Sequence, residues 1–277
     1  IAEELVQCAI TLSKSLDSMH HDFFHWLFTI FFNKTAVDVE ETRLTILKTL
    51  CAIIKQSASG VRENVFILQK RLRKALEEAT TLDMLVQTSE LMILIGEKYP
   101  GSLQAHFKDF IDILLGWFLD SRHPTLLVRP IEDIIIALSS YWKNDLAFSI
   151  TLLTQFEEDF EKYYQEVMVE LAKVKNPKAN KRVELNRAKM NVQLHKMSSL
   201  ARVFAIVLHK LDLSTINLRV FSSVKLNFDV VEFFITTLKL YINVVSSFQI
   251  FVDLCFFEEL LAECNLCIRL LLETLTL

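Results

Sequence analysis

The amino-acid sequence predicts an all-α protein, an α-solenoid built of HEAT-like antiparallel helix pairs. Its 277 residues include only four glycines and four prolines, far below the average usage of about 7% and 5%, so little turn chemistry is present for a β-sandwich or barrel. Apolar residues recur every three or four positions, which is the period of a helix. The expected helices pair at intervals of about 40 residues, the spacing of HEAT-type repeats. A compact helical bundle is the competing fold.

The clearest helix pair surrounds a reversal within residues 94–119. Pro100 cannot continue a helix, Gly101 tolerates a positive φ, and the Ser102 hydroxyl can cap the next helix. After the turn, the predicted buried stripe consists of Leu103, Phe107, Phe110, Leu114 and Trp117, widened by Ile111, Leu115 and Phe118. The opposite face carries Gln104, Lys108, Asp109 and Asp112. We therefore expect two antiparallel helices here, with Phe110 and Trp117 in the core.

Five helices are expected before the reversal, at about 2–16, 19–32, 39–59, 61–79 and 82–98. The second is apolar nearly all round, which predicts that neighbours enclose it. The third follows an acidic capping signal at Asp38, and its buried stripe comprises Val39, Ile46, Leu47, Leu50, Ile53 and Ile54. The exposed side of the fourth is basic, with Lys70, Arg71, Arg73 and Lys74.

After the reversal, His123-Pro124 ends the sixth helix, and Pro130 is placed in the first turn of a seventh that ends at Tyr141-Trp142. Asp145 then caps a helix of about 29 residues, which at 1.5 Å per residue is about 43 Å long. Its stripe comprises Leu153, Phe156, Phe160, Tyr163, Val167 and Leu171. Periodicity resumes with Leu194, Met197, Leu200, Ala201 and Phe204. Two further helices are expected at about 230–247 and 256–275, after a polar break at 213–227.

The apolar period fails in residues 173–189, which are strongly basic. Seven cations, opposed only by Glu184, give a local charge of seven minus one, or +6: Lys173, Lys175, Lys178, Lys181, Arg182, Arg187 and Lys189. This composition predicts a mobile, solvated loop. Contact with RNA phosphates or with an acidic protein is the alternative, although no aromatic residue lies among the cations to stack on bases.

Charge and hydropathy exclude some partners. The net charge of −4 gives no global reason to bind nucleic acid or an anionic membrane. Mean hydropathy is high, at +0.32, but the longest uncharged runs have thirteen residues (240–252) and eleven (23–33), whereas a membrane span needs about 20. We therefore expect no membrane partner. The first residue is Ile1 and the last residues, 270–277, are apolar, so the chain is expected to be a fragment of a larger one.

Cysteine usage indicates the compartment. Five cysteines are too few and too odd in number for a disulfide framework, so the expected location is the cytoplasm, or the nucleus as well. Cys264 and Cys267 form a CxxC, but they sit in a helical pattern without a second pair or a nearby histidine. They are interpreted as core thiols rather than as metal ligands or a redox pair.

Other clusters give weak site candidates. His21 and His25 are spaced like the ligands of zinc proteases and lie beside His20, but no glutamate between them supplies a base. The acidic run of Glu157, Glu158, Asp159 and Glu161 is typical of a solvated helix face. The phosphate loop, catalytic loop and metal-binding motif of a kinase do not occur in the sequence. We therefore assign no catalytic, cofactor-binding or metal-binding residue.

Two sequence blocks carry a resemblance to a known family. The first is the run IGEKYPGSLQAHF at 95–107, followed by Asp112-Ile113-Leu114 and Gly116-Trp117. The second comprises Trp142, 145–149, 151–153, Gln155-Phe156 and Glu158-Asp159, continued by Leu200, Arg202, Val203 and Phe204, with a weaker match at Asn265 and Cys267. Over roughly 90–205 the chain resembles the N-terminal HEAT-like region of the phosphatidylinositol-3-kinase-related kinase of nonsense-mediated mRNA decay. It departs from that pattern at 173–189, where the family carries an acidic, proline-containing insertion.

The resemblance implies a function for the parent protein and a role for this segment. The parent is implied to be a Ser/Thr kinase that phosphorylates an up-frameshift RNA helicase at Ser/Thr-Gln sites. ATP and a divalent metal are implied only in a kinase domain elsewhere. The segment, residues 1–277, is expected to be one non-catalytic scaffold that docks a regulatory heterodimer with a GTPase-like subunit. Two alternatives are an RNA-binding helical repeat, which would use residues 61–79 and 173–189, and a cargo adaptor without a kinase.

Overall fold

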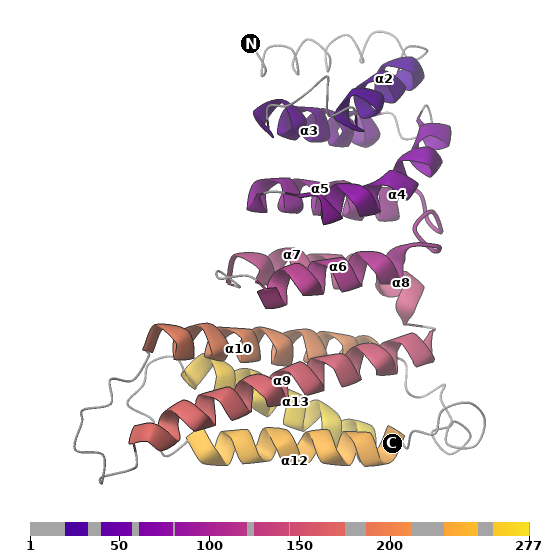
Figure 1. The fold of residues 1–277 in the computed structure, drawn as a ribbon. Helices are drawn as coiled ribbons and strands as arrows, with labels where there is room; N and C mark the ends of the chain where they lie inside the picture. Colours follow the sequence, from indigo (N-terminus) through magenta and orange to yellow (C-terminus); the bar gives the residue numbers. More distant parts are fainter. Residues whose placement is uncertain are drawn as a thin grey trace. The chain divides into compact units, whose positions relative to one another are not determined.

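A computed structural model describes residues 20–32, 40–56, 61–79, 81–120, 125–143, 145–174, 187–211, 230–248 and 257–276. These residues form helices and no strand, which confirms the all-α class (Figure 1). The HEAT-like solenoid stays a prediction. The chain divides into two compact units, which we call unit 1 (1–118 and 129–141) and unit 2 (119–128 and 142–277). The expected helix at 2–16, the Asp38 cap and the polar break at 213–227 lie outside the described residues.

Unit 1 contains α2 (His20–Phe32), α3 (Glu40–Gln56), α4 (Arg62–Glu77) and α5 (Leu82–Lys98). Helix α3 packs against both α2 and α5, and α4 packs against α5 (Figure 1). The stripe predicted for α3 is confirmed at Ile46, Leu47, Leu50, Ile53 and Ile54, which are all buried, whereas Val39 lies outside the described residues. Thr81 caps α5 by accepting a hydrogen bond from the Met84 N–H at 3.3 Å, and its hydroxyl donates to the Glu40 carboxylate at the start of α3.

Helix α2 is not enclosed on all sides, contrary to the prediction. Phe24, Phe28 and Phe31 are buried, but Trp26 is 56% exposed. The buried residues share one stripe at helical spacing, so Trp26 falls outside it and stacks instead on the Phe23 ring, with centroids 5.9 Å apart. Apolar residues on all sides of α2 therefore do not mean that other helices cover all of its sides.

The reversal after α5 has the predicted glycine geometry. Gly101 has a φ of 85°, and its N–H donates to the Tyr141 hydroxyl at 3.1 Å. The Phe107 ring stacks on the same tyrosine, with centroids 5.9 Å apart. The capping role of Ser102 is wrong: its hydroxyl is buried without a hydrogen bond, and the next helix, α6 (Phe107–Asp120), begins only after a turn over 101–106.

The stripe of α6 is buried as predicted, except at Trp117. Phe107, Phe110, Ile111, Leu114, Leu115 and Phe118 are buried. Trp117 is only half-buried, because its indole lies at the edge of the stripe and donates to the Leu76 carbonyl at 3.2 Å. On the other face, Asp109 accepts from Arg73 of α4 at 3.0 Å.

Helix α7 (Thr125–Ala137) starts earlier than the sequence predicted. Pro130 lies inside it rather than in its first turn. A proline there leaves the carbonyl four residues earlier without a helical donor, yet the helix continues and is followed by the single turn α8 (Ser139–Trp142). The apolar residues that follow Pro130 explain the continuation, because Ile131, Ile134 and Ile135 are buried.

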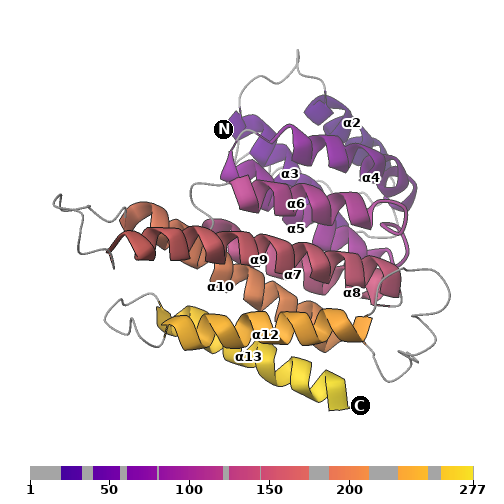
Figure 2. The same cartoon turned by 60° about the horizontal axis from the view of Figure 1, so that its bottom comes forward.

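The described part of unit 2 contains four long helices: α9 (Leu146–Val174), α10 (Arg187–Lys210), α12 (Val230–Phe248) and α13 (Phe257–Thr276). Helix α10 packs against α9 and α13, and α12 packs against α13 and α9 (Figure 2). The predicted Asp145 cap is confirmed, since its carboxylate accepts from the Phe148 N–H at 3.0 Å. So is the length of α9, at 29 residues. The stripes predicted for α9 and α10 are buried.

The cores of these four helices meet at one aromatic ring. Tyr241 of α12 lies edge-on to Phe160 of α9 at 4.9 Å between centroids, and to Phe204 of α10 at 5.7 Å. At the end of α12, the Ser247 and Tyr164 hydroxyls are 3.0 Å apart, which joins α12 to α9. The core of unit 2 is thus formed by contacts between residues that lie far apart in the sequence.

A matched pair of glycine substitutions tests the reversal. Gly101→Ala places a side chain at a φ of 85°, so we expect a loss of about 1–3 kcal/mol in the free energy of unfolding. Gly116→Ala lies within α6, where an added Cβ meets nothing within 4 Å, and should gain about 0.5–1 kcal/mol. Chemical denaturation measures both. Equal changes of the same sign would contradict the assigned turn geometry.

Candidate functional site

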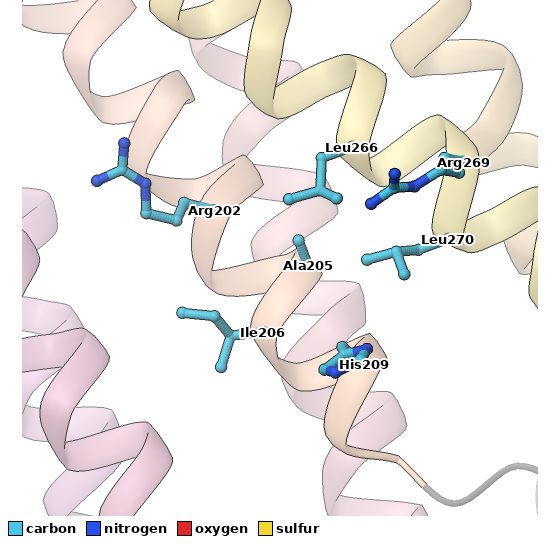
Figure 3. A pocket seen from close by; sticks show the side chains of 7 residues that line it. All are labelled: Arg202, Ala205, Ile206, His209, Leu266, Arg269 and Leu270. Atoms are coloured by element: carbon cyan, nitrogen blue, oxygen red, sulfur yellow. The ribbon is translucent and has the colours of Figure 1, made fainter.

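A groove of about 310 Å³ lies between α10 and α13 in unit 2 (Figure 3). Its floor is apolar, formed by Ala205 and Ile206 of α10 and by Leu266 and Leu270 of α13. Arg202, His209 and Arg269 stand around this floor. The groove therefore combines aliphatic surface with basic side chains, and the residues lining it include no carboxylate.

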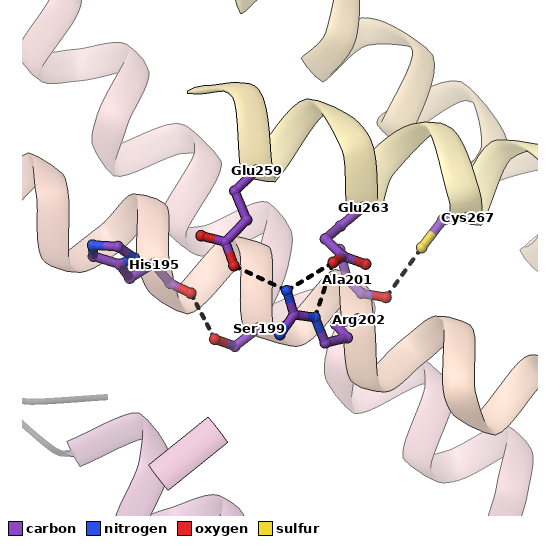
Figure 4. Close-up of polar contacts among 7 residues, drawn as sticks. All are labelled: His195, Ser199, Ala201, Arg202, Glu259, Glu263 and Cys267. Atoms are coloured by element: carbon purple, nitrogen blue, oxygen red, sulfur yellow. Dashed lines mark hydrogen bonds and ion pairs between the residues drawn. The ribbon is translucent and has the colours of Figure 1, made fainter. Parts of the chain in front are cut away.

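One end of the groove is fixed by an ion-pair clamp between the two helices. Arg202 of α10 donates from Nε to Glu263 at 2.9 Å, and its terminal nitrogen reaches Glu259 at 2.9 Å (Figure 4). The Glu263 side chain is only 15% exposed, so this pair is more shielded from water than a typical surface pair. The clamp sets the register of α10 against α13, and it uses the charge of Arg202 within the chain.

The other basic residues of the groove are less engaged. Arg269 lies 3.9 Å from Glu273 on its own helix, and both side chains are mostly exposed. His209 is exposed in the last turn of α10. At such exposure the Arg269–Glu273 pair contributes little, so Arg269 can turn to an acidic group of a partner at small cost.

The CxxC thiols lie in the core behind the groove, as predicted. Cys264 and Cys267 are buried, and the Cys267 thiol donates to the Ala201 carbonyl at 3.1 Å (Figure 4). Burial raises the pKa of the Cys267 thiol to about 12 and raises the pKa of the Cys264 thiol well above its ordinary value. Both therefore stay protonated at neutral pH, and a protonated thiol is a poor nucleophile and metal ligand.

The structure distributes the remaining candidates over separate surfaces. His25 is exposed and lies edge-on to Phe28, while the side chains of His20 and His21 lie outside the described residues. Within the described part of the chain, no three metal-binding side chains gather. In the acidic run of α9, Glu158 and Glu161 are exposed, but burial, followed by the charges of Glu161 and Glu158, raises the pKa of Glu157.

The basic loop is shorter than predicted. Lys173 belongs to α9, and Arg187 and Lys189 belong to α10, where Lys189 lies 3.8 Å from Glu166. The helices extend into the basic sequence because their apolar stripes continue through Leu171 and Met190, which are buried. Residues 175–186 lie outside the described part of the structure.

Three of the cations predicted on the exposed side of α4, Arg71, Arg73 and Lys74, are exposed, and each of them has a contact within the chain, whereas the side chain of Lys70 lies outside the described residues. Arg73 contacts both Glu77 and Asp109, and Lys74 lies 3.8 Å from Glu78. Arg71 lies over the rings of Phe28 and Phe32, at 5.4 and 5.6 Å from their centroids. These contacts reduce the charge that this helix can offer to a polyanion.

One expectation about membranes needs correction. Helix α12, with 19 residues, is long and apolar enough to cross a membrane by length and composition, which the count of uncharged runs missed because Lys239 interrupts it. A core helix passes the same test. Phe234, Tyr241, Val244 and Phe248 are buried within unit 2, but only 33% of the apolar window of α12 is buried, so length and composition alone do not assign α12 as a membrane span.

The sequence did not predict the groove. It depends on the pairing of α10 with α13, which lie far apart in the chain and whose partners local periodicity cannot specify. The available signal was weak: Leu266 and Leu270 recur at helical spacing beside the more deeply buried Cys264, Cys267 and Leu271, so they mark a flank of α13 rather than its core.

Breaking the clamp should cost stability that an exposed pair does not provide. In Arg202→Met, the shielded Glu263 carboxylate loses its cationic partner, and we expect the free energy of unfolding to fall by about 1–3 kcal/mol. Adding Glu263→Gln should recover part of this loss, since the two residues are coupled. The control is Arg73→Met, whose pair with Asp109 is exposed and whose unfolding midpoint should stay close to wild type. Additive effects of Arg202→Met and Glu263→Gln would show that the clamp is not an energetic unit.

Comparison with known proteins identifies what the chain is similar to. It is 28% identical to Serine/threonine-protein kinase SMG1 of Danio rerio over 216 residues, which are 76% of this chain and 6% of that protein. It is 31% identical to Serine/threonine-protein kinase Smg1 of Drosophila melanogaster over 88 residues, which are 32% of this chain and 3% of that protein. No family model and no solved structure matches. The chain therefore spans a small fraction of the length of these relatives, and it resembles a region of the SMG1 kinases, as the sequence predicted.

Proposed function

We propose that this chain is a non-catalytic scaffold segment of an SMG1-like Ser/Thr kinase and that it docks a regulatory heterodimer with a GTPase-like subunit. The observation that carries the proposal is the similarity to SMG1 over 216 residues, which covers most of the chain. Phosphorylation of an up-frameshift helicase in nonsense-mediated decay is proposed for the whole protein, with ATP and a divalent metal bound outside this segment. The proposed location is the cytoplasm, or the nucleus as well.

The surface proposed for docking is the α10–α13 groove. An amphipathic helix of the partner would bury apolar anchors on Ile206, Leu266 and Leu270 and would place an acidic side chain near Arg269 and His209. The clamp supports this role, because it holds both walls of the groove in one register before a partner arrives. A preformed groove avoids part of the ordering cost of association.

The two alternatives are less well supported. The cations of α4 that an RNA-binding surface would use include Arg73 and Lys74, and each lies beside a carboxylate of the same chain. A cargo adaptor without a kinase does not account for the similarity to SMG1. Neither alternative has an observation of its own in its favour.

A binding experiment with charge reversals tests the proposal. The 277-residue chain is titrated with the purified regulatory heterodimer by isothermal titration calorimetry. Arg269→Glu should weaken binding about tenfold or more, because it reverses a charge at the rim of the groove. The matched control is Arg129→Glu, whose side chain is 91% exposed in α7 and which should bind like wild type.

Two outcomes would contradict the proposal. Wild-type chain that does not bind the heterodimer would exclude the docking role. Equal weakening by Arg269→Glu and Arg129→Glu would show a response to net charge rather than to the groove.

A further inference from the structure

The outward side of the α12–α13 pair carries an aliphatic surface that no described element covers. On α12, Val231, Ile235 and Ile242 are 37%, 38% and 44% exposed, and Leu238 and Val245 between them are half-buried. On α13, Leu272 is 48% exposed. We call these six residues the outer stripe.

Helical phase places the outer stripe away from the other helices of unit 2. The α12 members recur at four, three, four and three positions, so they form one line along the helix. Ser247, which contacts Tyr164 of α9, lies about 160° around α12 from the centre of this line at 100° per residue. On α13, the clamp residue Glu263 faces α10, and Leu272 lies about 180° from it. The stripe therefore borders the seam between α12 and α13 on its free side.

The polar composition of the rest of α12 makes this stripe unusual. The exposed side beyond it carries Glu232, Thr236, Lys239, Asn243 and Ser246, as expected for a solvent-facing surface. The stripe itself contains only Val, Ile and Leu. Solitary exposed aliphatics need no explanation, but a continuous line of them marks a packing surface.

The order of residues along α12 is self-complementary. Read in either direction, the line is Val-Ile-Leu-Ile-Val, with Leu238 at its centre. In an antiparallel pair of α12 helices related by a two-fold axis at Leu238, Val231 lies level with Val245, and Ile235 lies within one residue of the level of Ile242. A two-fold interface requires this property, because one surface must fit its own copy.

The size of the surface is sufficient for a weak dimer. Helix α12 has 19 residues, or about 28 Å, and with α13 about 10 Å away the pair presents a face on the order of 500 Å². Two copies would bury on the order of 1,000 Å², near the lower limit for a specific interface.

We propose that the outer stripe is a homodimer interface, in which the α12 helices of two copies of this chain pack antiparallel about Leu238. The occupant of the surface is thus a second copy of the chain. The six residues of the outer stripe are all uncharged, so the association should depend little on salt.

Sedimentation equilibrium of the 277-residue chain tests the interface. The wild type should show a reversible monomer–dimer equilibrium. Ile235→Glu and Ile242→Glu should each raise the dissociation constant at least about tenfold, because each would bury a charge in the contact. The matched control is Val169→Glu, which places the same charge at an aliphatic residue of α9 that is 60% exposed. Unchanged melting curves would show that the variants are folded.

A cysteine cross-link tests the register. In a chain with Cys8 and Cys255 replaced by Ser, Leu238→Cys should form an intermolecular disulfide with its own copy, since facing Cα atoms on the axis come within about 4–7 Å. Ile242→Cys alone should not form this disulfide with its own copy, but it should cross-link to Ile235→Cys when the two variants are mixed. A wild type that is monomeric at every concentration, dimers unaffected by Ile235→Glu, or cross-linking equally strong at Ile242→Cys alone would each overturn the proposal.

Discussion

The packing of unit 2 depends on the ring of Tyr241. Phe160 and Phe204 lie edge-on to it, at 4.9 and 5.7 Å between centroids, and α13 brings the Cys264 and Cys267 thiols against the same side chain. Each edge-to-face pair contributes about 0.5–1.5 kcal/mol beyond the area it buries. Burial, and then the two thiols, raises the pKa of the Tyr241 hydroxyl well above its ordinary value. The tyrosine is therefore neutral at physiological pH and acts as a packing residue, so the four helices share one uncharged centre.

The polar contacts of unit 2 have a different role from this centre. Hydrogen bonds to a charged group contribute about 1.5–3 kcal/mol, and removing one large buried aromatic side chain costs about 3–5 kcal/mol. The Arg202 clamp thus contributes less to stability than the aromatic core does, but its directional hydrogen bonds fix the register of α10 against α13. Hydrophobic packing holds α10 and α13 together and so forms the groove of the proposed docking site, and the clamp fixes the shape of the groove.

The sequence predicted the properties that local periodicity determines. The buried stripes of α3, α9 and α10, the length of α9, the Asp145 cap and the positive φ of Gly101 follow from residue spacing and backbone chemistry within a few positions. The misplaced residues depend on neighbours distant in sequence. Trp117 lies at the edge of its stripe because α4 supplies the Leu76 carbonyl as a hydrogen-bond acceptor. Ser102 is buried because the turn is longer than expected. The exposure of Trp26 was not predicted because residue spacing does not specify which apolar side of α2 is covered. The groove and the outer stripe were not predictable for the same reason, since both depend on which helices pair.

The most direct test of this account is hydrogen exchange of the Tyr241→Ala chain, followed by mass spectrometry. Because three other helices pack against or beside the ring, the account predicts a joint loss of amide protection in α9, α10 and α13, with the free energy of unfolding lowered by about 3–5 kcal/mol. The nearby substitution Asn243→Ala, at an exposed residue on the polar side of α12, should leave protection in these helices close to wild type. Protection in α9, α10 and α13 that survives the loss of Tyr241, or that falls equally in Asn243→Ala, would contradict the central place given to this ring.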